Sequence, residues 1–345
     1  MSGSGSLKSV IRGVFLCAAS VAFAAASVAW GAQDVVQDRE RGLNHYRRST
    51  SLFAVVDIAG TLVSGSGVSS VAHLSTGQYE VTFTRDVSSC AYLATTANAY
   101  SQALQAYTAG GHLSGRGVYV ETKNQGGGLT DGPFHLVVVC GGGIGSKYAV
   151  VGYAADLVRS THGTTLTPLG FGRYEVKFPR RFHESVAPCA YLATVGDPGS
   201  ALVYNPAGVY TGSGPDWRTV YVETKNPGGG LQDGVPFHLA VVCPSAHRTR
   251  IGVVAQNGFL DRGSVFTASF KGATGKFALV TNRDLSECAT VATRGSVDRA
   301  VPFSPATVEV VPGPALNTVG LDLRNLLFFG GTPLDEAFHA ATVCK

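Results

Sequence analysis

A phenylalanine–histidine pair recurs near the end of each of three repeats, and its histidines are His135, His238 and His339. An imidazole titrates near neutral pH, so it can act as a general base or bind a metal ion. Histidines in three separate repeats can share one ion only if the repeats form a closed ring, and no serine or free cysteine is fixed beside any of them. We therefore predict structural imidazoles that pack on a sheet face or bond a backbone group. The sequence predicts no catalytic, cofactor-binding or metal-ligating residue.

A second set of polar side chains lies in a run, VYVETKN, that occurs at 118–124 and again at 220–226. Alternate residues of an extended strand share one face. An aromatic ring beside charged groups could contact a partner or a sugar; the alternative is a solvated face with cross-strand pairs. The third repeat has Leu-Asp-Leu-Arg-Asn at 321–325 in place of this outward face, so we expect contacts in the first two repeats. The candidate contact surface consists of Tyr119, Glu121, Lys123, Tyr221, Glu223 and Lys225.

Other patterns that resemble functional motifs have simpler interpretations. Glycine triplets at 126–128 and 228–230 lead into strand patterns, whereas a phosphate-binding loop leads into a helix and usually carries Lys-Ser or Lys-Thr. We interpret them as turns. The carboxylates form no repeated pair, which gives no support to a glycosidase. The net charge is +4, and its excess lies in the N-terminal 52 residues and the linkers rather than on a basic face, which argues against nucleic-acid binding.

Cysteine spacing predicts three disulfides. Without Cys17, which lies in the N-terminal apolar segment, six cysteines remain, two in each repeat. Six cysteines permit fifteen pairings, and a unit that folds by itself selects the pairing within each repeat. Such bonds persist in an oxidising compartment, and closing a loop of about 50 residues stabilises a fold by roughly 4 kcal/mol. The predicted pairs are Cys90 with Cys140, Cys189 with Cys243, and Cys288 with Cys344.

The elements that position these residues are predicted to be short strands. In the segment 78–85, Tyr79, Val81 and Phe83 alternate with polar residues, as in a half-buried antiparallel strand. The fold class is therefore all-β, with three tandem small antiparallel β-sandwich modules at 52–140, 148–243 and 250–345, each with one disulfide. The segment 97–115 lacks strand patterning and predicts a long surface loop. In module 1 the predicted strands are 53–58, 69–74, 78–85, 90–95, 117–124 and 134–140.

The first 32 residues predict a signal peptide, with Lys8 and Arg12 before an apolar, alanine-rich stretch. Cleavage is expected near Ala29 to Ala32, and the alternative is an uncleaved anchor. Residues 33–51 are polar with mixed charge and predict a tether. The expected location is secreted, with membrane contact only through an uncleaved signal.

The motifs of the modules, G-x-Y-E-V-x-F, C-A-Y-L-A-T, V-Y-V-E-T-K-N and P-F-H-L-x-V-V-C, occur at 77–83, 90–95, 118–124 and 133–140, with close counterparts in module 2. Together they resemble a repeat of uncharacterised secreted bacterial proteins of actinobacterial type. The resemblance covers about residues 52–345, although module 3 departs from most of it. It implies secretion and modular β structure, and it implies no activity or site residues.

These observations predict a secreted, non-enzymatic, multi-module protein for extracellular binding or surface interaction. Its partner would be an extracellular protein, a glycan or a wall polymer, and self-association is possible. Two alternatives stay open. One is a secreted hydrolase with a site between modules, and the other is a structural envelope component that self-associates through sheet edges.

Overall fold

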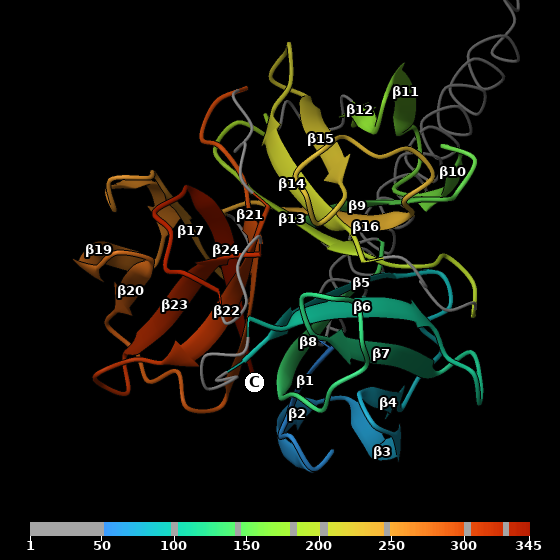
Figure 1. Cartoon of the computed structure of the whole chain (residues 1–345), viewed down its shortest axis with the longest axis horizontal. Coiled ribbons are helices and arrows are strands. Elements are labelled where there is room, and N and C mark those ends of the chain that lie inside the picture. The colour runs from blue at the N-terminus through green and yellow to red at the C-terminus, as the bar shows by residue number, and fades with distance from the viewer. Residues whose placement is uncertain are drawn as a thin grey trace, which may run out of the picture. The chain divides into compact units, whose positions relative to one another are not determined.

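Each repeat of the sequence forms strands in the same order (Figure 1). The computed structural model describes residues 52–97, 103–141, 146–179, 185–200, 206–244, 249–299, 305–326 and 331–345. Module 1 contains β1 (Leu52–Val56), β2 (Leu62–Ser66), β3 (Val68–Ser75), β4 (Gln78–Phe83), β5 (Ala91–Thr96), β6 (Gln105–Gly110), β7 (Gly117–Lys123) and β8 (Phe134–Val139). Module 2 contains β9 (Ser146–Val151), β10 (Leu157–Ser160), β11 (Thr165–Gly170), β12 (Arg173–Lys177), β13 (Ala190–Val195), β14 (Gly208–Ser213), β15 (Thr219–Lys225) and β16 (Phe237–Val242). Module 3 contains β17 (Thr249–Val254), β18 (Leu260–Ser264), β19 (Phe266–Ala273), β20 (Lys276–Thr281), β21 (Cys288–Arg294), β22 (Ala306–Pro312), β23 (Thr318–Asn325) and β24 (Phe338–Cys344).

Two antiparallel four-stranded sheets make up each module. In module 1 their strand orders are β2-β1-β8-β5 and β3-β4-β7-β6. Modules 2 and 3 repeat both orders, as β10-β9-β16-β13 with β11-β12-β15-β14, and as β18-β17-β24-β21 with β19-β20-β23-β22. The described residues therefore form the all-β arrangement of three tandem β-sandwich modules that the sequence predicts. We name the first sheet of each module the inner sheet and the second the outer sheet.

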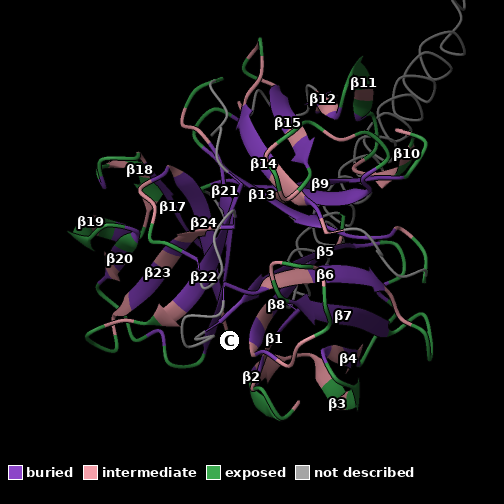
Figure 2. Ribbon diagram, viewed as in Figure 1, coloured by how far each residue is buried: buried purple, intermediate pink, exposed green. Residues whose placement is uncertain are grey.

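Alternating apolar residues hold the two sheets of a module together. In β4 the side chains of Tyr79, Val81 and Phe83 are fully buried, and they pack in one cluster with Phe134 and Leu136 of β8. Successive side chains on a strand point to opposite faces, so the other face of each outer sheet looks away from the sandwich. Modules 2 and 3 have equivalent clusters. Figure 2 shows that exposed residues gather on the edge strands β3, β11 and β19.

Each module has one disulfide between two neighbouring strands of its inner sheet. It joins the start of β5, β13 or β21 to the end of β8, β16 or β24. The bonds join the predicted partners, Cys90 with Cys140, Cys189 with Cys243, and Cys288 with Cys344. In module 3 the two cysteines are direct cross-strand partners on β21 and β24. Such disulfides are compatible with an extracellular protein.

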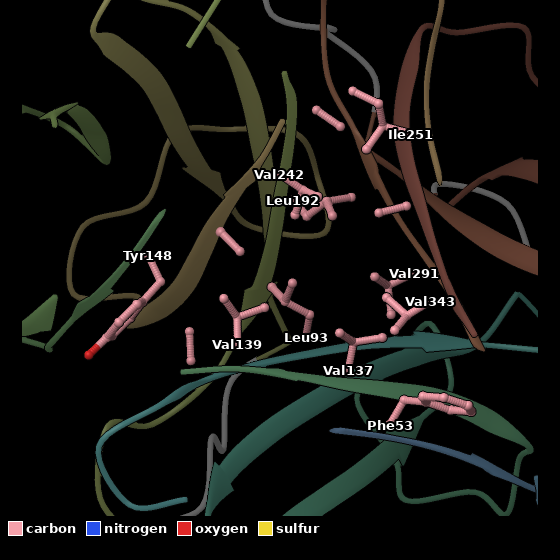
Figure 3. Packing of buried hydrophobic residues seen from close by; sticks show 14 of the residues in the cluster. Phe53, Leu93, Val137, Val139, Tyr148, Leu192, Val242, Ile251, Val291 and Val343 are labelled. Atoms are coloured by element: carbon pink, nitrogen blue, oxygen red, sulfur yellow. The ribbon is translucent and has the colours of Figure 1, made fainter. Parts of the chain in front are cut away.

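The inner sheets of the three modules also share a hydrophobic core of their own. It contains Phe53 and Leu93 from module 1, Leu192 from module 2, and Ile251 and Val291 from module 3, all at most 2% exposed. Figure 3 shows these side chains pointing from the strands of the three modules into one common space. Apolar burial is the main favourable term in folding, so each module depends on its neighbours for part of its stability.

Hydrogen bonds around this shared core form a closed cycle. In each module one threonine hydroxyl accepts the N–H of an alanine in a neighbouring module and donates to the C=O of the same alanine, at 2.7 to 3.2 Å. The third pair joins module 1 back to module 3, so the contacts close. The pairs are Thr194 with Ala94, Thr293 with Ala193, and Thr95 with Ala292.

The expectation of a surface loop over 97–115 is wrong in its second half. Residues 105–110 form strand β6, which pairs with β7 in the outer sheet and is partly or fully buried. The strand also reaches into module 2, where the N–H of Asp197 donates to the C=O of Thr108 at 2.9 Å. Strand β2 lay outside the predicted set too, and module 2 begins its first strand at Ser146, two residues before the expected boundary.

The expected signal peptide at 1–32 and the tether at 33–51 lie outside the described residues. Within the part of the chain that the structure describes, no helix is long and apolar enough to cross a membrane.

Val265 occupies a backbone conformation that disfavours its side chain. Its φ is +69°, whereas the equivalent turn of module 1 has Gly67 at φ +70°. A β-branched residue is strained in this region, at a cost of about 1–2 kcal/mol, and Val265 is 45% exposed, so its side chain contributes little burial. We expect Val265→Gly to raise the free energy of unfolding by about 1 kcal/mol, because glycine adopts this conformation without strain. Urea unfolding followed by circular dichroism measures the change.

Val63→Gly is the matched control for that substitution. Val63 is also exposed, at 64%, and is not among the residues with positive φ. The control should lower the stability, since glycine weakens a strand interior. A loss of stability in both variants would contradict backbone strain at Val265.

Candidate functional site

The outward faces of the three outer sheets have residues at equivalent positions, but side chains fill the face in modules 1 and 2 and leave a recess in module 3. Register places Tyr119 of β7, Tyr221 of β15 and Gly320 of β23 at the same position, opposite the next-to-last residue of β6, β14 or β22. The acidic position next along is Glu121, Glu223 or Asp322, and the basic position after it is Lys123, Lys225 or Arg324. The charge pattern thus persists in module 3, while the aromatic residue is missing.

In module 1 this face is filled. The hydroxyl of Tyr119 donates to Glu121 Oε1 at 3.1 Å, and Lys123 Nζ lies 2.8 Å from Glu121 Oε2. Lys123 Nζ is also 4.9 Å from the ring centre of Tyr107, and His112 stacks on Tyr119 at 4.1 Å. Tyr119, Glu121 and Lys123 are only 3–4% exposed. A contact surface and a solvated face both require exposed side chains here, and these three are buried.

Module 2 fills its face in the same way. The hydroxyl of Tyr221 donates to Glu223 at 2.9 Å, Lys225 Nζ lies 3.0 Å from Glu223, and it is 5.1 Å from the ring centre of Tyr210. Arg299 of module 3 adds a guanidinium group 5.6 Å from the ring centre of Tyr221. Burial, together with the neighbouring Glu223 carboxylate, raises the pKa of Tyr221 to about 12. Tyr221 and Lys225 are 7% and 4% exposed, and Glu223 is partly buried, so this half of the candidate contact surface is not an open face either.

In module 3 the corresponding face is hollow. A recess of about 440 Å³ lies over β20, β22 and β23, within the range of ligand pockets in proteins. Its charged lining residues are Lys276, Glu309, Asp322 and Arg324. Apolar groups complete the wall, including Val311, Pro312 and Pro314.

Two substitutions between the modules account for the hollow. Gly320 removes the tyrosine ring that fills the other faces. On the neighbouring strand Glu309 stands where modules 1 and 2 have Tyr107 and Tyr210. Val311 occupies part of the space beside Gly320, since a Cβ added to the glycine would meet Val311 Cγ2 at 2.5 Å.

A shorter connection accompanies these substitutions. The segment between β5 and β6 of module 1 has eight residues, against twelve between β13 and β14 of module 2. The connection that follows β21 in module 3 provides Arg299, which covers Tyr221 of module 2. The connection of module 1 contacts the outer sheet of module 3 through Leu104, whose N–H donates to Glu309.

The charged groups of the recess differ in their burial and in their contacts with other protein groups. Glu309 is 1% exposed, and its Oε1 accepts the N–H of Leu104 in module 1 at 3.0 Å. Arg324 lies 3.3 Å from Asp322, and their side chains are 15% and 13% exposed. Lys276, the cross-strand partner of Asp322, is exposed at the rim. The groups open to a ligand are therefore an ammonium group and a carboxylate–guanidinium pair.

The three histidines lie between modules rather than in a recess. Nδ1 of His238 accepts the N–H of Tyr92 at 2.9 Å, and Nδ1 of His339 accepts the N–H of Tyr191 at 3.0 Å. Nδ1 of His135 accepts the N–H of Thr290 at 2.8 Å. The prediction of structural imidazoles that bond a backbone group is confirmed, and that group belongs in each case to a neighbouring module.

Burial governs the charge state of these imidazoles. It lowers the pKa of His135 to about 4. It lowers the pKa of His238 and of His339 to about 3, with further depression from the charges of Arg159 and Arg262 respectively. Nδ1 accepts an N–H, so protonation there would set two donors against each other. All three rings are therefore neutral near pH 7.

A second cavity, of about 80 Å³, lies where β5, β13 and β21 meet. Its lining includes Thr95, Thr194 and Thr293, whose hydroxyls already accept one hydrogen bond and donate another. It is much smaller than the recess of module 3. Among the described residues no group of three or more His, Cys, Asp or Glu is placed to hold a metal ion.

No family model, curated protein or solved structure matches the chain. The candidate site therefore rests on the geometry of the described residues.

Sequence reasoning directed attention to modules 1 and 2 and missed the recess. The signal that could have found it is the alignment of 319–325 with 118–124. It replaces Tyr119 with Gly320 while Asp322 and Arg324 keep the charges of Glu121 and Lys123. A lost bulky residue beside retained charges is the pattern that opens a polar pocket.

Proposed function

We propose that this chain is an exported, non-enzymatic binding protein that holds an extracellular glycan, wall polymer or protein on the outer sheet of module 3. The observation that supports it is the 440 Å³ recess, which retains accessible charged groups on a face that the other two modules fill. The Cys288–Cys344 disulfide and the shared core constrain module 3, which limits the entropy lost on binding.

The histidines support a non-enzymatic function. Each imidazole uses Nδ1 to accept a backbone N–H, and the depressed pKa removes it from the range in which a general base works near pH 7. These groups serve the packing of modules, so a hydrolase would need other residues.

An array of glycans, wall polymers and secreted proteins tests the proposal with the mature chain. Binding that is lost in the double variant Val311→Gly with Gly320→Tyr is the expected result, because the pair restores the Gly212–Tyr221 pairing of module 2 and fills the recess. No binding on the array, together with turnover by the purified chain in a hydrolase panel, would replace the proposal with the hydrolase alternative.

Self-association is the second candidate, favoured by the exposure of one edge strand. Strand β19 has eight residues, most of them exposed, and its Phe270 is 59% exposed. An exposed edge can pair with another chain. Light scattering over a range of concentrations distinguishes it: oligomers that Phe270→Lys abolishes would favour the structural component, whereas a concentration-independent monomer favours the binding protein.

A further inference from the structure

We infer that the recess of module 3 binds a neutral saccharide of one or two rings through Asp322, Arg324 and Lys276. The inference rests on the proposed function and specifies its ligand class. It begins with the charges of the lining, which cancel, since Lys276 and Arg324 are matched by Glu309 and Asp322. A lining with no net charge gives no preference to an anion or a cation.

The Asp322–Arg324 pair favours hydroxyl groups over ions. The two side chains lie 3.3 Å apart, and each satisfies the charge of the other. An ionic ligand would have to compete with this contact. A hydroxyl both donates and accepts, so neighbouring hydroxyls can donate to the Asp322 carboxylate and accept from the Arg324 guanidinium while the pair stays intact. Hydrogen bonds to charged groups are stronger than those between neutral groups.

The rest of the recess suits the remaining surface of a sugar ring. Lys276 at the rim offers donors to a further hydroxyl. Val311, Pro312 and Pro314 offer an apolar wall against which the C–H groups of a pyranose can pack. The volume of about 440 Å³ is enough for a ligand of one or two rings.

Modules 1 and 2 provide an internal comparison. Their acidic and basic side chains form the same kind of pair, Glu121 with Lys123 and Glu223 with Lys225, but a tyrosine hydroxyl already donates to each glutamate. The hydroxyl of Tyr119 or Tyr221 thus occupies the position that we assign to a ligand hydroxyl in module 3.

Titration of the mature chain with glucose, galactose, mannose and their disaccharides tests the inference, by calorimetry and by amide chemical shifts. We expect millimolar or tighter binding to at least one sugar, with the largest shifts at Gly320 and its neighbours on β22. The double variant Val311→Gly with Gly320→Tyr should weaken binding at least tenfold. Lys276→Gln, which reproduces Gln78 of module 1 and changes only an exposed side chain, should weaken it several-fold without affecting the fold.

Arg173→Gln is the matched control, because Arg173 holds the strand position of Lys276 on the filled face of module 2. It should leave saccharide binding unchanged. Saccharide binding that survives in the double variant, or that Arg173→Gln weakens as much as Lys276→Gln does, would overturn the site. Absence of binding by the folded protein to all the sugars up to about 50 mM would overturn the ligand class. In that case, a protein or charged polymer on the array that binds the unmodified chain and does not bind the double variant would still support the proposed function.

Discussion

Acidification from pH 7 to about pH 4.5 should lower the free energy of unfolding of the three-module body by about 7–8 kcal/mol, and most of the loss should occur below pH 6.5. The cause is the three histidines between modules, whose pKa values in the folded chain are about 4 for His135 and about 3 for His238 and His339. Their ordinary pKa is about 6.5. Between these pH values the histidines of the unfolded chain bind protons and those of the folded chain do not, so the free energy of unfolding falls as the pH falls.

The size of the effect follows from the same linkage. Well below pH 6.5 each histidine lowers the stability by about 1.4 kcal/mol per pH unit, so three lower it by about 4 kcal/mol per unit. Domains are typically stable by about 5–15 kcal/mol, so a loss of this size removes half or more of the stability of a typical domain. Carboxylates with lowered pKa values, such as Asp216 and Asp131, also lose stability on acidification, but only as the pH approaches the ordinary aspartate value near 4.

Urea unfolding at pH 7.5, 6.5, 5.5 and 5.0 measures this dependence. His238→Asn is the informative variant, because an amide oxygen can still accept the N–H of Tyr92 and does not titrate. It should reduce the slope of stability against pH by about a third. Equal stability of the unmodified chain at pH 7.5 and pH 5.0 would contradict the assignment of neutral imidazoles between the modules.

Removing either partner of the buried ion pair Arg294–Glu336 should cost about 3–5 kcal/mol. The two side chains are 2% and 9% exposed and contact each other directly. Burial lowers the pKa of Arg294 to about 10, yet the group stays charged at neutral pH. Arg294→Val would leave the Glu336 carboxylate buried without its counter-charge, and Glu336→Val would leave the guanidinium group buried without its own. An uncompensated buried charge strongly destabilises the folded state.

The double variant Arg294→Val with Glu336→Val should recover most of that loss. Module 2 has Val195 and Val235 at the equivalent positions, where they pack together in an apolar cluster. Replacing a buried pair with packed apolar residues is often neutral. A double-mutant cycle in urea measures the coupling. Losses that simply add would mean that the two side chains act independently, against the observed contact.

The strand pattern of the sandwich could be predicted from the sequence because it is a local property. Alternation of Tyr79, Val81 and Phe83 depends on which face meets the second sheet of the same module, and the disulfide partners repeat with the module. Strand β6 could not be found in this way. One of its faces meets its own sandwich and the other lies against module 2, where Tyr107 packs with Val195 and Ala207, so its residues show no polar–apolar alternation.

The candidate surface failed for a related reason. Alternating polar residues predict exposure only when nothing covers them, and Glu121 and Lys123 satisfy each other under Tyr107 and its neighbours. Their recurrence in two modules marks a buried ion pair. In module 3 the informative change is the missing side chain at Gly320. It can be recognised as a lost tyrosine only after the register has aligned β23 with β7 and β15.

The closed cycle of contacts has a consequence for how the chain folds. The bonds from Ala292 to Thr95 and from Thr290 to His135 join residues 197 and 155 positions apart. Contacts of such separation form slowly because a long loop must close first. Until β21 and β24 arrive, the first two modules present the apolar side of their inner sheets to solvent, as aggregation-prone intermediates do. A chain that ends at residue 243 should therefore aggregate during refolding, rather than behave as a stable two-module protein.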